Sequence, residues 1–509
     1  MLSQLSKEKW TYDTAAHLAA RAGFGESPFR LEQWTHQGME ATVQELLHPA
    51  NDTTPPPSCV VPNQFAELRE RVQEATSPEG QVQARQALRQ ATNQQLYGLI
   101  NWWTQRMLTT PAPLIEKMTL FWHGHFATSG FKVRSSYKLW QQNETFRQHA
   151  LGNFATLTKA ISRDPGMMVY LDLATSHAEH PNENFARELM ELFTLGEGNY
   201  SEADIKESAR AFTGYRIDRF EQFRFVKNQF DGGNKTFLQQ SGNWNGDKII
   251  DIILKQPVAA KFISSKLWKF FAYEDPDSQL IEKLAELFRQ NYEIRPLLET
   301  IFSSEEFYSQ HARNAIVKCP VQYVVESGRT LGVNIPSGRT LFAVYQRLGQ
   351  VPFYPPNVKG WDGGKSWINT ATLTFRYQLA RQLVLGIRLV NEPQPAKPRL
   401  AAPSAEPSPL AQASPSAQTS PTTQTASSTA LNVVRLPALP VDQLVTAEDR
   451  KDPEAVVRKI CARAFQTTPD PQLFDRILAV AKLKPLPLAD DAIRDLVALM
   501  MMTPNYQVC

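Results

Sequence analysis

The sequence predicts a mainly α-helical protein with one large domain, and three observations support this fold class. Apolar residues recur at helical spacing over long stretches, glycines and prolines mark helix ends, and the strict alternation of a strand is rare. The 509 residues, of which 42% are hydrophobic and 21% charged, are ordinary for a globular protein. We therefore expect a multi-helix fold with at most a small β-hairpin excursion.

Local signals place several of the elements. Residues 184–196 follow a proline and end at Gly196, a residue suited to a left-handed cap. Residues 201–214 begin with Ser201, a favoured N-cap residue, and carry an acidic residue in the first turn. Residues 215–239 alternate enough to predict the hairpin.

A change in composition divides the chain into three parts. Residues 1–391 form the predicted main helical domain. Residues 392–440 form the predicted linker, which is rich in Pro, Ser, Ala and Thr and cannot bury enough apolar surface to offset its conformational entropy. Residues 441–509 are predicted to form a small helical unit that docks on the main domain through its apolar faces.

Two stretches of the chain resemble each other weakly. In both, an apolar helix reaches a Pro/Asp turn, a second amphipathic helix follows, and a third helix ends in Ser or Thr three residues before an aromatic residue (Ser304 and Phe307; Thr503 and Tyr506). Either an internal repeat or the convergence of two three-helix units explains this pattern.

The sequence also limits the compartment and the partners. We see no signal peptide and no apolar run of membrane-spanning length, so we expect no membrane insertion and a cytoplasmic location. Export to the periplasm or cell surface with a partner that carries the signal is the alternative. The net charge of +3 is small, which gives no reason to expect nucleic acid. The four cysteines, Cys59, Cys319, Cys461 and Cys509, are far apart and suggest neither disulfides nor a thiolate zinc site.

The segment "FWHGHFATS" places His123 and His125 on either side of Gly124 in an aromatic and apolar run. The chain before it looks helical up to Trp122, and Gly124 is suited to end the helix. Side chains two residues apart point about 200° apart on a helix but to the same side of an extended segment. The two rings therefore converge only if the chain leaves the helix. They are either core or capping histidines, or ligands of a divalent metal.

The predicted helix at 184–196 carries a polar stripe of Asn184, Glu188 and Glu191 beside its apolar face, with Arg187 between the two faces. Two carboxylates one turn apart can bind a metal, share a proton or pair with arginines. Together with the two histidines, they would make a metal site if the two segments meet.

The next predicted helix offers Glu207 and Arg210, which are also one turn apart. The candidate catalytic residues are therefore Glu188, Glu191 and Glu207. The candidate binding residues on these two helices are Asn184, Arg187 and Arg210. A salt-bridge network that holds the helices in register explains the same residues without any chemistry.

The loop "FYPPNVKGWDGGKSWINT" is the most unusual loop of the chain. Its prolines and glycines fix turns, and Asn357, Trp361 and Trp367 stand among them. Tryptophan and asparagine on a rigid loop suit a sugar-binding or peptide-binding surface. They also suit an ordered loop that closes over a helical core.

Eight motifs in order resemble the bacterial domain of unknown function 1800 family. They are "HLAARAGFG", "EKMTLFWHGHFATS", "ISRDPGMMVYLD", "NENFARELMELFTLGEG", "ADIKESARAFTGY", "KFISSKLWKFF", "IRPLLETIFSSEEFYS" and "PPNVKGWDGGKSWINT". The resemblance spans about residues 17–383 and extends to the C-terminal helices.

The resemblance implies little about activity, because the family has no established function. Its members are commonly encoded next to a second uncharacterised family that resembles sulfatases and alkaline phosphatases. We therefore expect a helical scaffold or accessory protein that acts with an exported partner of this type. The alternatives are a metal-assisted hydrolase built on the His/Glu candidates and a carbohydrate-binding surface at Trp361 and Trp367. The sequence shows no cofactor apart from that divalent metal, and it leaves open whether the protein is an enzyme.

Overall fold

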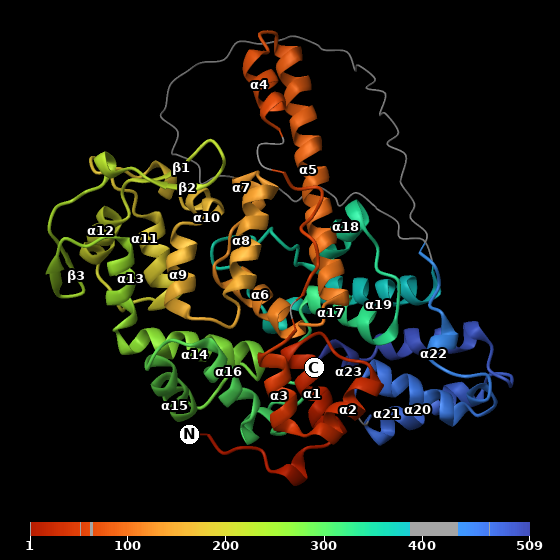
Figure 1. The fold of residues 1–509 in the computed structure, drawn as a ribbon. Helices are drawn as coiled ribbons and strands as arrows, with labels where there is room; N and C mark the ends of the chain where they lie inside the picture. Colours follow the sequence, from red (N-terminus) through yellow and green to blue (C-terminus); the bar gives the residue numbers. More distant parts are fainter. Residues whose placement is uncertain (1, 51, 62–64, 387–435, 468) are drawn as a thin grey trace, which may run out of the picture.

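The computed structural model describes residues 2–50, 52–61, 65–386, 436–467 and 469–509 (Figure 1). These residues are mainly helical, with two small antiparallel sheets, so the predicted fold class is confirmed. The predicted β excursion consists of two short hairpins. Among the described residues, no helix has both the length and the apolar character needed to cross a membrane.

Short helices, a long helical hairpin and a group of packed helices form the first part of the chain. They are η1 (Lys7–Lys9), α1 (Tyr12–Ala22), α2 (Pro28–Gln37), α3 (Met39–Leu47), α4 (Ala66–Glu74), α5 (Pro78–Thr109), α6 (Pro113–His125), α7 (Gly130–Val133), α8 (Ser136–Gln148), α9 (Phe154–Ser162) and α10 (Pro165–Tyr170). The hairpin of α4 and the first half of α5 projects from the body of the protein (Figure 1). Buried residues in α5 begin only at Gln95, so the first half of this helix is covered mainly by α4.

The middle of the chain contains the hairpins and the carboxylate-bearing helices. Its elements are η2 (Leu173–Thr175), α11 (Asn184–Glu188), the π-helix η3 (Leu189–Thr194), α12 (Glu202–Ala211), β1 (Tyr215–Ile217), β2 (Phe223–Phe225), η4 (Lys227–Gln229), β3 (Lys235–Phe237) and β4 (Gln240–Gly242). Tyr215 lies opposite Phe225 in one hairpin, and Lys235 lies opposite Gly242 in the other. The predicted cap is confirmed, because the Ser201 side chain accepts from the third backbone N–H of α12 in a capping box.

The remaining helices surround the rest of the core. They are α13 (Gly246–Leu254), α14 (Pro257–Phe271), α15 (Ser278–Arg289), α16 (Ile294–Phe302), η5 (Glu305–Tyr308), α17 (Pro320–Glu326), the π-helix η6 (Ser327–Leu331), α18 (Gly338–Leu348), η7 (Gly364–Trp367), α19 (Thr370–Leu385), η8 (Val441–Gln443), η9 (Asp449–Lys451), α20 (Pro453–Ala464), α21 (Pro471–Lys482), α22 (Asp490–Met501) and α23 (Pro504–Gln507).

Most of the predicted linker, 392–435, lies outside the described residues. Its final stretch, 436–440, is described and runs beside α19. Leu439 is buried there, and its N–H donates to the Val384 carbonyl at 2.9 Å. Beyond it, α22 packs on α19 and α20 packs on η6. The C-terminal helices therefore share one hydrophobic cluster with α5 and α17–α19.

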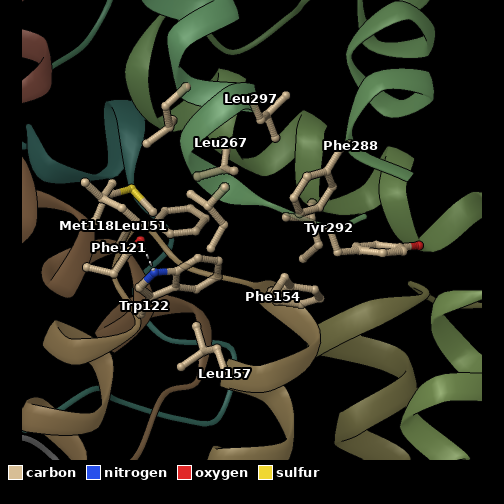
Figure 2. Packing of buried hydrophobic residues seen from close by; sticks show 14 of the residues in the cluster. Met118, Phe121, Trp122, Leu151, Phe154, Leu157, Leu267, Phe288, Tyr292 and Leu297 are labelled. Atoms are coloured by element: carbon tan, nitrogen blue, oxygen red, sulfur yellow. Dashed lines mark hydrogen bonds between the residues drawn. The ribbon is translucent and has the colours of Figure 1, made fainter. Parts of the chain in front are cut away.

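Helix α6 lies between the two hydrophobic clusters of the described residues. Most of its apolar side chains join the first cluster, in which Trp122 packs with Met118, Phe154 and Leu267 (Figure 2). Leu120 joins the second cluster, which includes the C-terminal helices. Helix α6 is therefore packed on most sides, and this packing fixes the side chains that the helix presents to the site described below.

Helix bounds support an internal repeat. The first three-helix unit is α14–α15–α16 with η5, and the second is α20–α21–α22 with α23. The number of residues that separates the end of α14 from the end of α20 is the same as the number that separates the start of α15 from the start of α21. The helices α15 and α21 both have 12 residues. The end of α16 and the end of α22 are separated by slightly more residues. The same larger separation holds between the starts of η5 and α23 and between their ends. The second unit therefore carries a short insertion between the end of α21 and the end of α22.

The caps of the middle helices match as well. The Asp277 carboxylate accepts from the Gln279 N–H at 2.6 Å to cap α15. The Asp470 carboxylate accepts from the Gln472 N–H at 2.7 Å to cap α21. Middle helices of equal length, an offset that is constant from the end of the first helix to the end of the second, and equal caps favour the repeat over the convergence of two unrelated units.

Candidate functional site

The two histidines of "FWHGHFATS" both lie within α6. We expected the helix to end near Gly124, but it continues through Gly124 to His125. The apolar neighbours of this glycine are buried on both sides of it, and their burial outweighs the small helix penalty of one glycine. His123 and His125 therefore point in different directions and do not converge.

His123 is a core histidine. Its ring is 1% exposed, and Nε2 accepts a hydrogen bond from the Phe353 N–H at 2.8 Å. The ring proton therefore resides on Nδ1. Burial lowers the pKa of His123 to about 3, so the ring stays neutral at physiological pH.

His125 is also buried but borders a cavity. Its Nε2 lies 3.0 Å from the Phe193 carbonyl oxygen, which only accepts, so Nε2 carries the proton. Its Nδ1 then accepts from the Lys266 ammonium at 3.3 Å. Burial, with the Lys266 charge as a second cause, lowers the pKa of His125 well below its ordinary value.

The carboxylates of α11 and η3 have their own partners. Glu191 accepts a hydrogen bond from the Tyr200 hydroxyl at 2.8 Å. Glu188 is half-buried, and its pKa is raised first by burial and then by the Glu191 charge. Throughout the described part of the chain, no group of three or more His, Cys, Asp or Glu side chains is arranged to hold a metal ion. The candidates His123, His125, Glu188 and Glu191 are therefore not brought together.

The other polar candidates on these helices form salt bridges. Arg187 holds the Glu202 carboxylate through two nitrogens at 2.8 and 2.9 Å. Arg210 holds Glu207 at 2.9 Å and Asp231 at 2.7 Å.

Asn184 adds a weaker tie, because its amide donates to the Asp172 carboxylate at 3.2 Å. The Glu207 carboxylate also accepts from the Thr236 N–H at 3.0 Å, which connects α12 to the second hairpin. These contacts support the structural interpretation of Asn184, Glu207 and the two arginines.

The tryptophan loop, residues 353–367, spans from α6 to the turn after α14. Gly360 has φ of +84°, and a Cβ there would overlap the Gly124 carbonyl oxygen. Gly364 has φ of +53°, and a Cβ there would overlap the Glu274 carboxylate. The position of Gly360 therefore requires glycine, since backbone blocks the Cβ position, and at Gly364 the positive φ favours glycine. Asn357 turns the loop by accepting from the Lys359 N–H at 2.8 Å.

Beneath this loop lies a cavity of about 590 Å³, here called the lysine cleft because Lys117, Lys266, Lys269 and Lys359 line it. Its walls come from α6, α14, the segment 315–322 and the tryptophan loop. The cleft brings together three of the candidate residues from the sequence: His125, Trp361 and Trp367. The other candidate residues are not among those that line it.

Lys117 forms part of the floor of the cleft. The side chain is 3% exposed and donates to the Gly23 carbonyl at 3.0 Å and to the Gln322 amide oxygen at 2.8 Å. Burial lowers the pKa of Lys117. The neighbouring carboxylate of Glu326 is already paired with Lys318 at 2.7 Å.

Lys266 forms the floor on the α14 side. It donates to the Leu192 carbonyl at 3.0 Å and to His125, and both acceptors are neutral. Burial lowers the pKa of Lys266 to about 8. Within the described residues, neither Lys266 nor Lys117 has a carboxylate within salt-bridge distance.

This lack of a counter-charge contrasts with another buried charge on α6. The buried Glu116 carboxylate pairs with Arg106 at 2.8 Å and with Arg147 at 2.6 Å, and it accepts from the Trp103 indole at 2.8 Å. The fold therefore pairs Glu116 with two arginines, whereas neither ammonium group of the cleft floor has a carboxylate within salt-bridge distance among the described residues, and Glu326 acts on Lys117 only from farther away. An anion would supply the missing charge.

Sequence reasoning missed Lys117 and Lys266. The available signal is that each lysine stands in an apolar helical stretch and in a motif of the family, "EKMTLFWHGHF" and "KFISSKLWKFF". Lys117, Phe121 and His125 also follow each other at intervals of four on α6, which places them on one helical face.

The comparisons with known proteins identify a family and nothing more specific. The family model described as "Protein of unknown function (DUF1800)" matches residues 17–508. No curated protein and no solved structure matches the chain. The match covers almost the whole chain, including the helices on both sides of the lysine cleft. The chain therefore belongs to the DUF1800 family of proteins of unknown function.

Proposed function

We propose that this protein binds an anionic ligand in the lysine cleft. The observation that carries the proposal is a pair of ammonium groups, those of the buried Lys117 and the partly buried Lys266, that have no carboxylate within salt-bridge distance among the described residues. Burial of an unpaired charge costs on the order of several kcal/mol of stability, even after the surroundings relax. A bound carboxylate, sulfate or phosphate would offset this cost.

The size and chemistry of the cleft support this function. A volume of about 590 Å³ lies in the range of small-molecule sites. Phe121, Phe270 and two tryptophans add apolar wall next to the charged floor. Such a combination holds an ionic group at one end and an organic body at the other.

The metal-assisted hydrolase has less support. Its proposed acids, Glu188, Glu191 and Glu207, do not line the lysine cleft. Glu207 is occupied by Arg210, and Glu191 by Tyr200. Nearby, the neutral His125 is held by the Phe193 carbonyl and Lys266.

The test is isothermal titration calorimetry with sulfate, phosphate and a panel of small carboxylic acids at constant ionic strength. The wild-type protein should bind at least one of them, and Lys266→Met should weaken binding at least about tenfold, which is about 1.4 kcal/mol. Lys255→Met, at an exposed lysine outside the cleft, should bind as the wild type does. No binding by the wild type, or equal loss in both variants, would reject the proposal.

A second candidate function is the scaffold or accessory role beside a sulfatase-like or phosphatase-like partner. The projecting hairpin of α4 and α5 favours this role, because an exposed helical arm that does not pack against the core offers a surface for a partner (Figure 1). Arg85 and Arg89 are exposed on this arm. If the arm docks the partner, the double variant Arg85→Glu/Arg89→Glu should lose co-purification with it. Recovery of the partner in equal amounts would count against this role.

A further inference from the structure

Helix α6 presents one continuous face to the lysine cleft. Lys117, Phe121, Gly124 and His125 all line the cleft, and they lie near one face of the helix. Along this face, Lys117 supplies a positive charge, Phe121 an aromatic ring and Gly124 a stretch of backbone without a side chain. Of these four, only Gly124 lacks a structural reason for its identity.

Glycine inside a helix is less stable than alanine, so an interior glycine needs an explanation. Tight packing does not supply one, because a Cβ on Gly124 would meet no atom within 4 Å. Backbone conformation does not supply one either, since Gly124 is helical. Because Gly124 lines the cleft and a Cβ there would meet open space, the glycine leaves a stretch of helix backbone uncovered at the cleft wall.

Trp361 borders this bare patch. The preceding residue, Gly360, rests on the Gly124 carbonyl, and the Trp361 ring lies 5.9 Å from the ring of His123, the residue before Gly124. The indole is half-buried, so part of its surface is open to the cleft. An indole face that is partly open to the cleft suits the apolar face of a ring-shaped ligand.

The rim of the cleft carries exposed side chains of both charges, because Lys269 and Lys359 line it together with three carboxylates. Glu274, Asp275 and Asp362 line it and are exposed. In the part of the chain that the structure describes, no lysine, arginine or histidine forms a salt bridge with any of the three. Hydroxyl groups of a ligand would donate hydrogen bonds to these carboxylates.

We propose that the ligand is an acidic sugar: a pyranose with one acidic group, whose ring lies over Gly124 against Trp361 while the acidic group reaches Lys266. The proposal rests on the anion binding proposed above and adds the class of the ligand. In this arrangement the lysines of the floor bind the single negative charge, the Trp361 indole packs against the apolar face of the ring, and the carboxylates of the rim accept hydrogen bonds from the hydroxyl groups. The lowered pKa of Lys266 fits a site that awaits a counter-ion.

The test uses saturation-transfer NMR and calorimetry with four probes: glucuronic acid, glucose 6-sulfate, glucose and benzoate. The wild type should bind glucuronic acid or glucose 6-sulfate at least tenfold more tightly than glucose and benzoate. The preferred acid separates a carboxylate ligand from a sulfate ligand. Binding of sulfate ion or benzoate without either acidic sugar would overturn the ligand class and leave the proposed anion binding intact.

Gly124→Ala tests the placement of the ring. This variant should keep or raise the melting temperature and should lose at least tenfold in affinity for the acidic sugar. Gly232→Ala, at an exposed glycine with equally open space outside the cleft, should bind normally. Unchanged affinity in Gly124→Ala, or a lower melting temperature, would overturn the placement.

Asp362→Asn tests the rim in a way that does not depend on Gly124. Loss of this carboxylate should weaken the acidic sugar and leave sulfate ion as tightly bound or more tightly bound. Parallel weakening of both probes would overturn the role of the rim. Failure of the wild type to bind any anion would remove both this inference and the proposed function.

Discussion

The two three-helix units share one frame but treat equivalent lysines differently. When the two units are aligned on the ends of α14 and α20, Lys266 on α14 corresponds to Lys459 on α20. Lys459 pairs with the Asp449 carboxylate at 2.6 Å and is about half exposed. Lys266 has only neutral acceptors and faces the lysine cleft.

The partners of the two lysines explain the contrast. The ammonium of Lys459 and the Thr446 hydroxyl and N–H lower the pKa of Asp449 to about 2. The charge of this carboxylate is therefore stabilised by its hydrogen-bond and ion-pair partners. Burial instead lowers the pKa of Lys266 to about 8. The lysine of the second unit pairs with a carboxylate of η9, just before α20, whereas the lysine of the first unit faces a cavity without a carboxylate partner. Equivalent positions in the two units therefore differ in whether a carboxylate lies within reach, although the helices that carry them are arranged alike.

The largest expected difference between the units is in their cores. Trp268 is fully buried in the first unit, and the equivalent position in the second unit is Cys461, which is also buried. Trp268→Ala should cost about 3–5 kcal/mol of unfolding free energy, because it leaves a large cavity. Cys461→Ala should cost about 1 kcal/mol, since it removes one small group. Urea unfolding measures both, and equal costs would show that the two cores are not packed as described.

The pH dependence of stability separates the two lysines. Because the pKa of Lys266 in the folded protein is about 8, below the ordinary value of 10.5, protonation of this group costs stability at low pH. That cost is full below pH 8 and disappears as the pH rises toward 10.5, so the wild type should gain stability relative to Lys266→Met across this window. The gain should be on the order of 2 kcal/mol.

Lys459→Met is the matched control for this prediction. It removes one half of an exposed ion pair, so the wild type should show no such gain over it in the same window. Chemical unfolding at pH 7, 8.5 and 10 measures both differences. A flat difference for Lys266→Met would contradict the absence of a counter-charge.

The smallest effect concerns the matched caps. Asp277→Ala and Asp470→Ala should each cost about 1 kcal/mol, because each removes the acceptor for an otherwise unpaired N–H at a helix start. Similar losses in urea unfolding would support the repeat. A loss in only one of them would show that the two middle helices are capped differently in solution.

The sequence was sufficient for the helical class and for several local features. Ser201 as a cap and Gly196 as a left-handed residue follow from short-range hydrogen bonding and sterics, and both are confirmed. Gly124 was predicted wrongly as a helix end. A glycine signal is local, and burial of the apolar residues around it in a central helix overrides that signal.

The site was less accessible to prediction because its partners are distant in sequence. Spacing on one helix identified Glu207 beside Arg210, but it could not reveal Asp231, which also binds that arginine. A lysine in an apolar helix is usually explained by a stem that packs while the charge reaches water. Only the tertiary structure shows that Lys266 reaches a cavity floor without a carboxylate.

The central claim is that Lys266 awaits an anion, and its ammonium titration tests this most directly. In protein labelled with 13C-lysine, the Cε signal absent from Lys266→Met identifies the residue and is followed against pH with and without the tightest anion. We predict a pKa near 8 without the anion and a rise of at least one unit with it, while Lys459 does not respond. An anion that leaves the Lys266 titration unchanged, or a Lys266 that titrates with the exposed lysines from the start, would contradict the account.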